Sequence, residues 1–136
     1  MYRVSREFSF CYGHRLLNYD GKCRHLHGHN GRAIISLEAA ELDDKGMLVD
    51  FTEIKRHVQG WVDANLDHNM LLHRDDPLLP ILEDRGERVF VMDFNPTAEN
   101  IARLIFEQAA RAGLPVVEVI LWETENCHAA YTGPGR

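Results

Sequence analysis

Alternating hydrophobic and polar positions open the chain and predict its first strand. Across residues 2–14, hydrophobic side chains occupy every second position with one interruption at Arg6, and His14 is the next position of that face. Residues 32–42 alternate in the same way, so Ala33, Ile35 and Leu37 share a face. The glycine-rich residues 15–31 between them are expected to form an ordered loop. We expect the two strands to pair antiparallel.

Helical spacing replaces the two-residue alternation after the turn-forming "DDKG" at 43–46. Asp50 and Glu53 have the spacing of a capping box, which predicts a helix start. A stripe at intervals of three and four residues then predicts an amphipathic helix; it consists of Phe51, Ile54, Val58, Trp61, Val62 and Leu66. A second helix is predicted over 97–112, opened by Pro96 and Thr97 and ended by Gly113.

Three further strands are predicted in the second half of the chain. They cover "RVFVMDF" at 88–94, residues 115–125 and "AAYTG" at 129–133. Residues 73–87 carry no clear pattern. The resulting order is strand, strand, helix, short strand, helix, strand, strand. It predicts an α+β fold, residues 1–136 as a single domain, with two helices packed on one face of a mainly antiparallel sheet.

Composition excludes several classes of protein. The formal net charge of −6 argues against a nucleic-acid-binding protein, although a polyanionic small substrate could still meet a local basic patch. No apolar run approaches the roughly 20 residues of a membrane-spanning helix. The first residues lack the apolar core of a secretory signal, and three scattered cysteines do not make a disulfide framework. We therefore expect a cytoplasmic protein with no membrane partner.

Three histidines are the best candidates for metal ligands. His27 and His29 are two residues apart, so an extended backbone directs both to one side, in register with the core face of the second strand. His14 ends the core face of the first strand. In an antiparallel pair these positions meet at the rim of the core, where three neutral imidazoles with one open position suit catalytic zinc. His25 is a weaker candidate.

Cys23 in "CRHLHGH" has two interpretations. It could be a fourth zinc ligand that closes a structural site. It could instead stay free as an acid–base group whose thiolate is favoured by nearby cations. Structural zinc sites generally contain two closely spaced cysteines, which this stretch lacks, so the catalytic interpretation is favoured.

Three other polar residues interrupt apolar surroundings. Asp67 and His68 follow the first helix, where a carboxylate can orient an imidazole, although an ordinary polar helix end explains them equally well. Glu123 continues the apolar face of Val117, Val119 and Leu121. A carboxylate there could bind two parallel N–H groups of a guanine- or pterin-like ring, or the strand could already have reached solvent.

Six motifs together resemble the 6-pyruvoyl-tetrahydropterin synthase and 6-carboxytetrahydropterin synthase family. They are "FSFCYGHRL", "CRHLHGH", "MLVDFTEIK", "LDHNMLL", "NPTAEN" and "LWETEN", in family order across nearly the whole chain. The resemblance implies the tunnelling fold and assembly into a homo-oligomer, typically a hexamer, with active sites between subunits. The sequence departs from the family where "CYGH" replaces "AAH" and where Gly31 replaces an aromatic residue.

By this resemblance, His14, His27 and His29 bind Zn²⁺, and Cys23 is the catalytic cysteine. Asp67 and His68 complete the proton-transfer group from a neighbouring subunit. Glu123 anchors the pterin ring, and Thr97 lies near it. Arg15, Lys22 and Arg24 are candidates for contact with triphosphate on charge alone.

The spacing between Cys23 and His27 resembles the bacterial 6-carboxytetrahydropterin synthases of queuosine biosynthesis. The function implied is a zinc-dependent lyase that converts 7,8-dihydroneopterin triphosphate to 6-carboxy-5,6,7,8-tetrahydropterin, acetaldehyde and triphosphate. The alternatives are triphosphate elimination to 6-pyruvoyl-tetrahydropterin and a non-catalytic zinc- or pterin-binding module.

Overall fold

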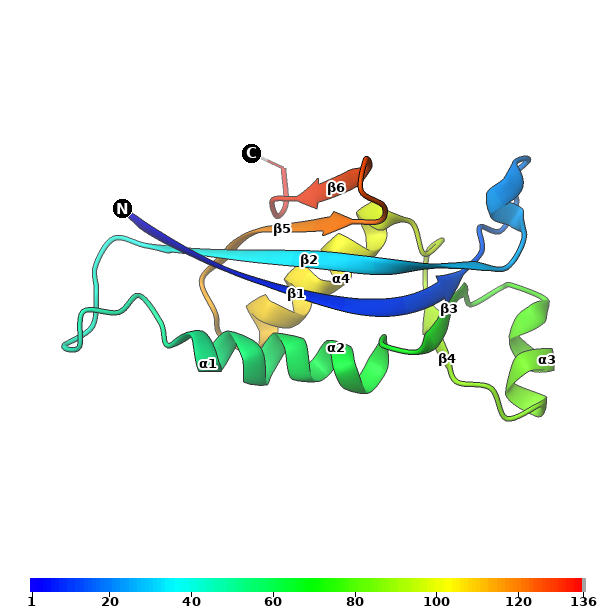
Figure 1. Ribbon diagram of the computed structural model, residues 1–136, viewed down its shortest axis with the longest axis horizontal. Helices are drawn as coiled ribbons and strands as arrows, with labels where there is room; N and C mark the ends of the chain where they lie inside the picture. Colours follow the sequence, from blue (N-terminus) through cyan, green and yellow to red (C-terminus); the bar gives the residue numbers. More distant parts are fainter. Residues whose placement is uncertain (136) are drawn as a thin grey trace.

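Two long strands form the centre of the molecule. The computed structural model describes residues 1–135, in which β1 (Tyr2–His14) pairs antiparallel with β2 (His27–Ala39). Their register is continuous from Tyr2 opposite Ala39 to His14 opposite His27. Figure 1 shows the pair as a twisted ribbon that runs the length of the molecule.

Four shorter strands extend this pair into a six-stranded sheet of order β4-β3-β1-β2-β5-β6. On one side, β5 (Val116–Trp122) and β6 (His128–Tyr131) continue the antiparallel pairing. On the other side, β3 (Asn69–His73) and β4 (Val89–Met92) pair in parallel with their neighbours. The sheet is therefore mixed, and its parallel side departs from the mainly antiparallel sheet predicted above.

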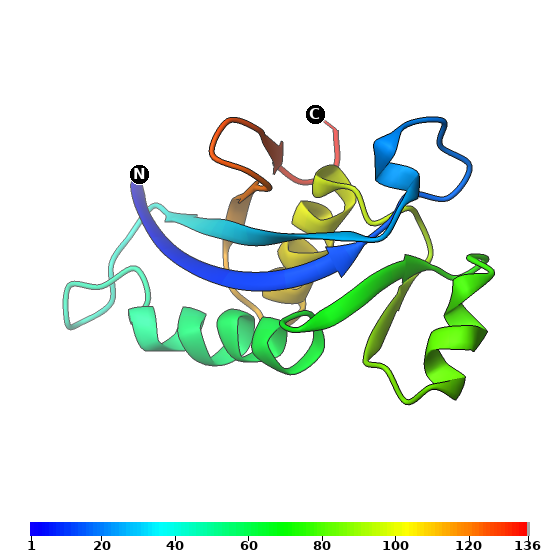
Figure 2. The same ribbon diagram turned by 45° about the vertical axis from the view of Figure 1, so that its right-hand side comes forward.

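The helices cover one face of the sheet. The first is continuous and consists of α1 (Phe51–Ile54), the π-helical turn η2 (Lys55–Gln59) and α2 (Gly60–Asn65). Asp50 caps it by accepting the Thr52 backbone N–H at 2.9 Å, as a helix start requires. α4 (Ala98–Arg111) lies beside it against β5 and β6, and α3 (Leu78–Asp84) lies at the far end of the molecule (Figures 1 and 2).

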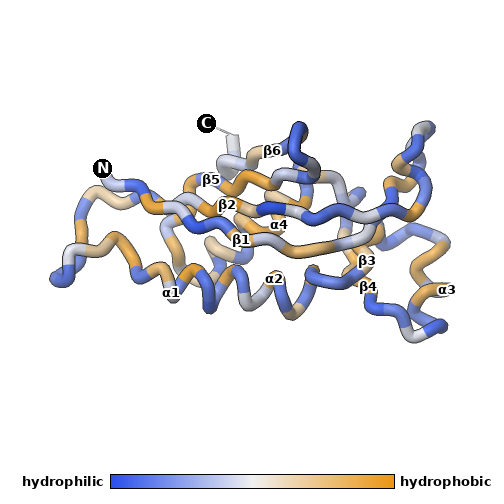
Figure 3. Tube along the Cα trace, in the orientation of Figure 1, coloured by the Kyte–Doolittle hydropathy of each residue, from blue (hydrophilic) through white to orange (hydrophobic). Residues whose placement is uncertain are grey.

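The predicted alternation of β1 and β2 builds the core. Side chains of the two strands pack with the apolar stripes of both long helices and with β5. Hydrophobic residues gather in these elements, whereas the turn after β2 and the turn between β5 and β6 are hydrophilic (Figure 3). The fully buried members include Ile35, Leu37, Ile54, Val58, Val62, Ile101, Ile105, Val119 and Leu121. The predicted α+β fold is confirmed.

Several boundaries differ from the prediction. β2 begins at His27 rather than residue 32, because the strand continues through the glycines without a bulge, and the loop is correspondingly shorter. β5 ends at Trp122, one residue before Glu123. The unassigned stretch and the residues before it contain β3 and α3. Within residues 1–135, no helix combines the length and apolar character needed to cross a bilayer.

Candidate functional site

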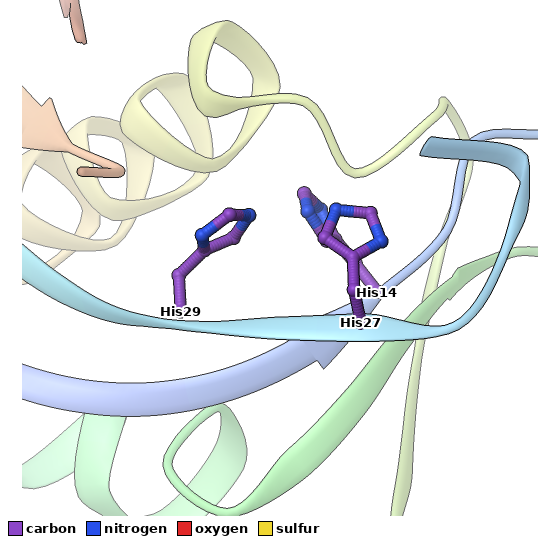
Figure 4. A group of neighbouring side chains, drawn as sticks. All are labelled: His14, His27 and His29. Atoms are coloured by element: carbon purple, nitrogen blue, oxygen red, sulfur yellow. The ribbon is translucent and has the colours of Figure 1, made fainter. Parts of the chain in front are cut away.

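Three imidazoles converge at one end of the central pair of strands. His14 and His27 are direct partners across the strands, and His29 lies two residues further along β2 on the same face. Their ring centroids are 4.5, 5.0 and 5.1 Å apart. Figure 4 shows the three rings on one side of the strands, facing α4 and the loop that precedes it. This is the convergence predicted from strand parity.

Backbone carbonyls orient two of these rings. His14 Nδ1 lies 2.6 Å from the Pro96 carbonyl oxygen, and His27 Nδ1 lies 2.7 Å from that of His25. Because a carbonyl only accepts, each Nδ1 carries the proton and each Nε2 presents its lone pair. The Nε2 atoms of all three histidines are buried without a hydrogen-bond partner among the described residues. Such oriented, unpartnered imidazole nitrogens fit a metal ion.

The electrostatics favour the neutral ligand form. Burial lowers the pKa of His14, and it also lowers that of His29, against the opposing charge of Glu123. Metal binding needs uncharged imidazoles. The three donors lie within 4.8 Å of one another, close enough for one ion to draw them into a single coordination sphere. Imidazole nitrogens in threes suit zinc with an open fourth position.

The predicted substrate-binding and thiol residues gather beside this cluster. Cys23, Thr97 and Glu123 line a cavity of about 530 Å³ together with His14. Cys23 is half-buried on the short helical turn η1 (Lys22–Arg24). Glu123 follows β5 directly, and its Oε1 lies 3.5 Å from His29 Nε2. Its side chain is 24% exposed, so the strand has not reached open solvent there.

Hydrogen bonds hold the loop after β1 together and against the segment that precedes α4. The Leu16 N–H donates to the Cys23 carbonyl oxygen at 2.8 Å. The Asn95 side chain accepts the Leu17 N–H at 2.8 Å and donates to the Leu17 carbonyl at 2.9 Å. These contacts keep Cys23 beside His14. Sequence reasoning missed Asn95, which nothing in the local pattern distinguishes from a turn residue.

Of the basic residues considered for triphosphate, Arg15 has a buried acidic partner, whereas Arg24 lies 3.8 Å from the exposed carboxylate of Asp20. Its guanidinium donates from Nε and Nη2 to the two carboxylate oxygens of Asp76, at 2.8 and 2.5 Å. The Asp76 side chain is fully buried. Lys22 and Arg24 lie on η1 near Cys23.

Asp67 and His68 do not meet Cys23 within one chain. His68 borders a separate open cleft of about 600 Å³, where its Nδ1 lies 2.8 Å from Asp67 Oδ2 and 3.5 Å from Cys11 Sγ. Cys11 alternates with Tyr12 along β1, so this group lies on the face opposite the three imidazoles.

The Tyr12 ring lies beside Gly31, one of the two positions at which the sequence departs from the family motifs. A Cβ atom on Gly31 would lie 2.9 Å from the Tyr12 ring, so this ring fills the space of a side chain at position 31. Tyr12 is 3% exposed, and its hydroxyl has no hydrogen-bond partner among the described residues. Burial keeps the phenol neutral by raising its pKa, and the charge of Glu123 adds to this.

The fold and the three-histidine cluster define a protein of the tunnelling fold (T-fold) with a candidate metal centre. Similarity to known proteins identifies its family. The family model described as 6-pyruvoyl tetrahydropterin synthase matches residues 3–134. The chain belongs to this family and is an enzyme of it.

Curated relatives are similar over nearly the whole chain. A protein of Rickettsia typhi is 37% identical, with 93% of this chain and 97% of the relative covered. One of Haemophilus influenzae is 30% identical, with 96% and 99% covered. Both relatives are named 6-carboxy-5,6,7,8-tetrahydropterin synthase.

Solved structures share the fold. An uncharacterized protein of Wolinella succinogenes superposes with a TM-score of 0.80 at 29% identity, covering 98% of each chain. The Caenorhabditis elegans 6-pyruvoyl tetrahydropterin synthase superposes with a TM-score of 0.73 at 23% identity, covering 98% of this chain and 96% of that one. At 23% identity, the similarity to the Caenorhabditis elegans protein shows a shared fold only.

Proposed function

We propose that this enzyme is a zinc-dependent lyase that converts 7,8-dihydroneopterin triphosphate to 6-carboxy-5,6,7,8-tetrahydropterin, acetaldehyde and triphosphate. The observation that carries the proposal is the convergence of three unpartnered Nε2 atoms beside a cavity lined by Cys23 and Glu123. The names of relatives at 30–38% identity support the carboxypterin product over the pyruvoyl one. We also propose that the enzyme acts in the cytoplasm and serves queuosine biosynthesis.

His14, His27 and His29 would hold the zinc ion. When bound there, zinc would supply Lewis acidity that lowers the pKa of the substrate's side-chain hydroxyls. The contribution of the chain is orientation: the carbonyls of Pro96 and His25 fix two imidazoles with Nε2 toward the common centre. No reorientation of these two rings is needed before the metal binds.

Cys23 and Glu123 would act on the substrate from the walls of the same cavity. Glu123 would accept two parallel N–H groups of the pterin ring through its two carboxylate oxygens, which places the side chain of the substrate toward His14. Cys23 would move protons along that side chain. The Thr97 hydroxyl accepts the Asn100 N–H as a helix cap at 3.2 Å, and its own proton remains available for the ring.

Asp67 and His68 would complete proton transfer in a second copy of the chain. The His68 side chain is 68% exposed and lies 2.8 Å from the Asp67 carboxylate, which can orient it. It borders a different cleft from Cys23, so a site with both groups needs two chains. We infer a homo-oligomer, with a hexamer as the assembly that the family resemblance favours.

The direct test incubates the purified protein with dihydroneopterin triphosphate and assays substrate, triphosphate and acetaldehyde. Acetaldehyde formed in proportion to substrate consumed is the expected result. Consumption without acetaldehyde would replace the product by 6-pyruvoyl-tetrahydropterin. No consumption by the zinc-loaded enzyme would contradict the lyase itself.

Two variants separate catalytic from structural roles for the thiol. Cys23→Ala should keep its zinc and lose turnover by a factor of about 100 or more, because proton transfer is removed. Cys127→Ala, which removes an exposed thiol that lines the same cavity, is the matched control and should retain turnover. Loss of zinc from Cys23→Ala would show instead that Cys23 closes a four-ligand structural site.

Subunit complementation tests the shared site. Cys23→Ala and His68→Ala oligomers should each be inactive, whereas random mixed oligomers at equal ratio should regain roughly a quarter of wild-type sites, since each site draws one group from each chain. The double variant Cys23→Ala/His68→Ala mixed with Cys23→Ala is the control and should regain nothing. Failure of the two single variants to complement would place both groups in one chain.

A further inference from the structure

The Tyr12 side chain combines deep burial with an unused hydrogen-bonding group beside the candidate metal centre. It is 3% exposed, and its hydroxyl has no hydrogen-bond partner among the described residues. Between centroids, its ring lies 5.3 Å from the His14 ring and 5.7 Å from the His29 ring. A buried hydroxyl without a partner costs stability that a phenylalanine of the same shape would not. Such a group points to a partner that is gained in the functional state.

The hydroxyl end of the Tyr12 ring reaches across β2. The ring atom nearest to a Cβ on Gly31 is Cε1, at 2.9 Å, and Cε1 adjoins the carbon that carries the hydroxyl. Because Tyr12 pairs with His29, the ring has leaned along β2 by two residues to lie over Gly31. Leu121 Cδ1, on the next strand β5, lies 3.5 Å from the same Cβ position. The phenol is therefore directed from β1 across β2 toward β5.

Glu123 stands at the position that this direction meets. In the register of β2 and β5, Arg32 pairs with Trp122. Gly31 and Glu123 are therefore the next positions outward along the two strands. The Glu123 side chain also lies on the same face of the sheet as the three histidines, since its Oε1 is 3.5 Å from His29 Nε2. The phenol and the carboxylate thus approach each other over the backbone of Gly31.

The Glu123 carboxylate is short of hydrogen-bond donors. Its one ion-pair contact among the described residues is with His29 Nε2, and that nitrogen is reserved for the metal ion in the proposed function. A carboxylate offers about four acceptor positions on its two oxygens. Two parallel N–H groups of a bound ring use two of them and leave the others for a donor from the protein. The charge of Glu123 adds to burial in raising the pKa of Tyr12, which agrees with the proximity of the two groups.

We propose that Tyr12 is a positioning residue, whose hydroxyl donates a hydrogen bond to the Glu123 carboxylate when that carboxylate holds a ring with two parallel N–H groups. The hydrogen bond fixes the carboxylate so that both of its oxygens face the ring. The inference rests on the anchoring role proposed for Glu123, but it does not depend on which product the enzyme releases. It gives a role in binding to a residue of "CYGH", where the sequence departs from the family motif.

Calorimetric binding of 7,8-dihydroneopterin, which carries the ring without the triphosphate, to the zinc-loaded enzyme tests this proposal. Tyr12→Phe keeps the aromatic ring and removes the hydroxyl, so Kd should rise about tenfold, the scale of one hydrogen bond to a charged group. In turnover of the triphosphate substrate, KM should rise while kcat stays nearly unchanged, because the thiol and the metal ligands remain in place. Tyr131→Phe is the matched control, since the Tyr131 ring packs against Phe106 at 5.0 Å, and it should bind like wild type.

Zinc content and thermal unfolding check that Tyr12→Phe keeps the histidine cluster and the fold. An unchanged Kd, or a loss of zinc that accounts for the weaker binding, would overturn the proposal.

A crystal structure of the zinc-loaded enzyme with dihydroneopterin should place the Tyr12 hydroxyl oxygen within about 3 Å of a Glu123 oxygen. A hydroxyl bonded to water or directly to the ring would contradict the positioning role. Ring binding that depends on Tyr12, without release of acetaldehyde, would refute the carboxypterin lyase and leave this inference standing. Absence of ring binding by wild type would refute the inference together with the anchoring role of Glu123.

Discussion

Replacing Asp76 by Asn should destabilise the fold, because Asp76 forms a buried ion pair with Arg15. Arg15 begins the loop after β1, directly beyond the candidate metal ligand His14. The Asp76 carboxylate is fully buried and accepts hydrogen bonds from two guanidinium nitrogens of Arg15 and from the Leu78 N–H at 2.8 Å. Asp76→Asn keeps the size of the side chain but removes its charge and turns one acceptor into a donor facing Arg15.

The magnitude follows from the burial of the pair. Removing one partner of a buried ion pair typically lowers the free energy of unfolding by about 3–5 kcal/mol. Because the Arg15 side chain is 21% exposed and solvent can partly compensate its charge, we expect a loss at the lower end, about 3 kcal/mol. For a chain of this length that corresponds to a melting temperature lower by roughly 10 °C. The Arg15 hydrogen bond lowers the pKa of Asp76, against the effect of burial. The stabilisation that this ion pair gives to the fold is present at pH values above the pKa of about 3.9 that Asp76 has in the unfolded state. It is lost as the pH falls through the lower pKa that Asp76 has in the folded state.

Chemical denaturation of wild type and Asp76→Asn between neutral pH and about pH 3 measures both effects. The difference in unfolding free energy should be largest at neutral pH and shrink as the acid limit is approached. Asp75→Asn is the matched control, because that side chain is 74% exposed, and it should change stability by less than about 0.5 kcal/mol. Equal effects of the two substitutions, or a difference independent of pH, would refute the reasoning.

Three further substitutions test packing around the site by denaturation of the metal-free protein. Tyr12→Phe removes a buried hydroxyl that has no partner among the described residues and should stabilise the fold by about 1 kcal/mol; destabilisation would reveal a bound partner. Gly31→Ala places a methyl group 2.9 Å from the Tyr12 ring and should cost about 1–3 kcal/mol, a penalty that should vanish in a Tyr12→Ala background. Thr97→Ala removes the acceptor for the Asn100 N–H and should cost about 1 kcal/mol, whereas Thr97→Ser should not.

Strand periodicity predicted correctly where the three imidazoles lie. A side chain in a strand points to the same face as its neighbours two residues away, so His27 and His29 inherit the face of Ala33 as long as the strand is continuous. β2 is continuous from His27 to Ala39. The glycines within it could have reversed the parity through a bulge, and only the register of the structure excludes that.

Parallel pairing could not be predicted in the same way. β3 covers only Asn69–His73 and has no regular alternation of exposed and buried positions, so its residues carry no two-residue period from which pairing could be predicted. Pro77 stands immediately before α3, which obscured that helix in the sequence. The contacts of Cys11 with Asp67 and His68 were missed for a related reason, since they join residues more than fifty positions apart.

The same alternation divides the chemistry of the protein between two faces of one sheet. Even positions of β1 direct His14 and Tyr12 to the core and the candidate metal centre, whereas Cys11 meets His68 on the other face. No local movement brings a side chain through a hydrogen-bonded sheet. A reaction that needs both Cys23 and His68 must therefore draw one of them from another chain. The edge strands β4 and β6 present backbone groups through which a neighbouring sheet could pair. The division of the site is thus itself a physical reason to expect an assembly of this enzyme.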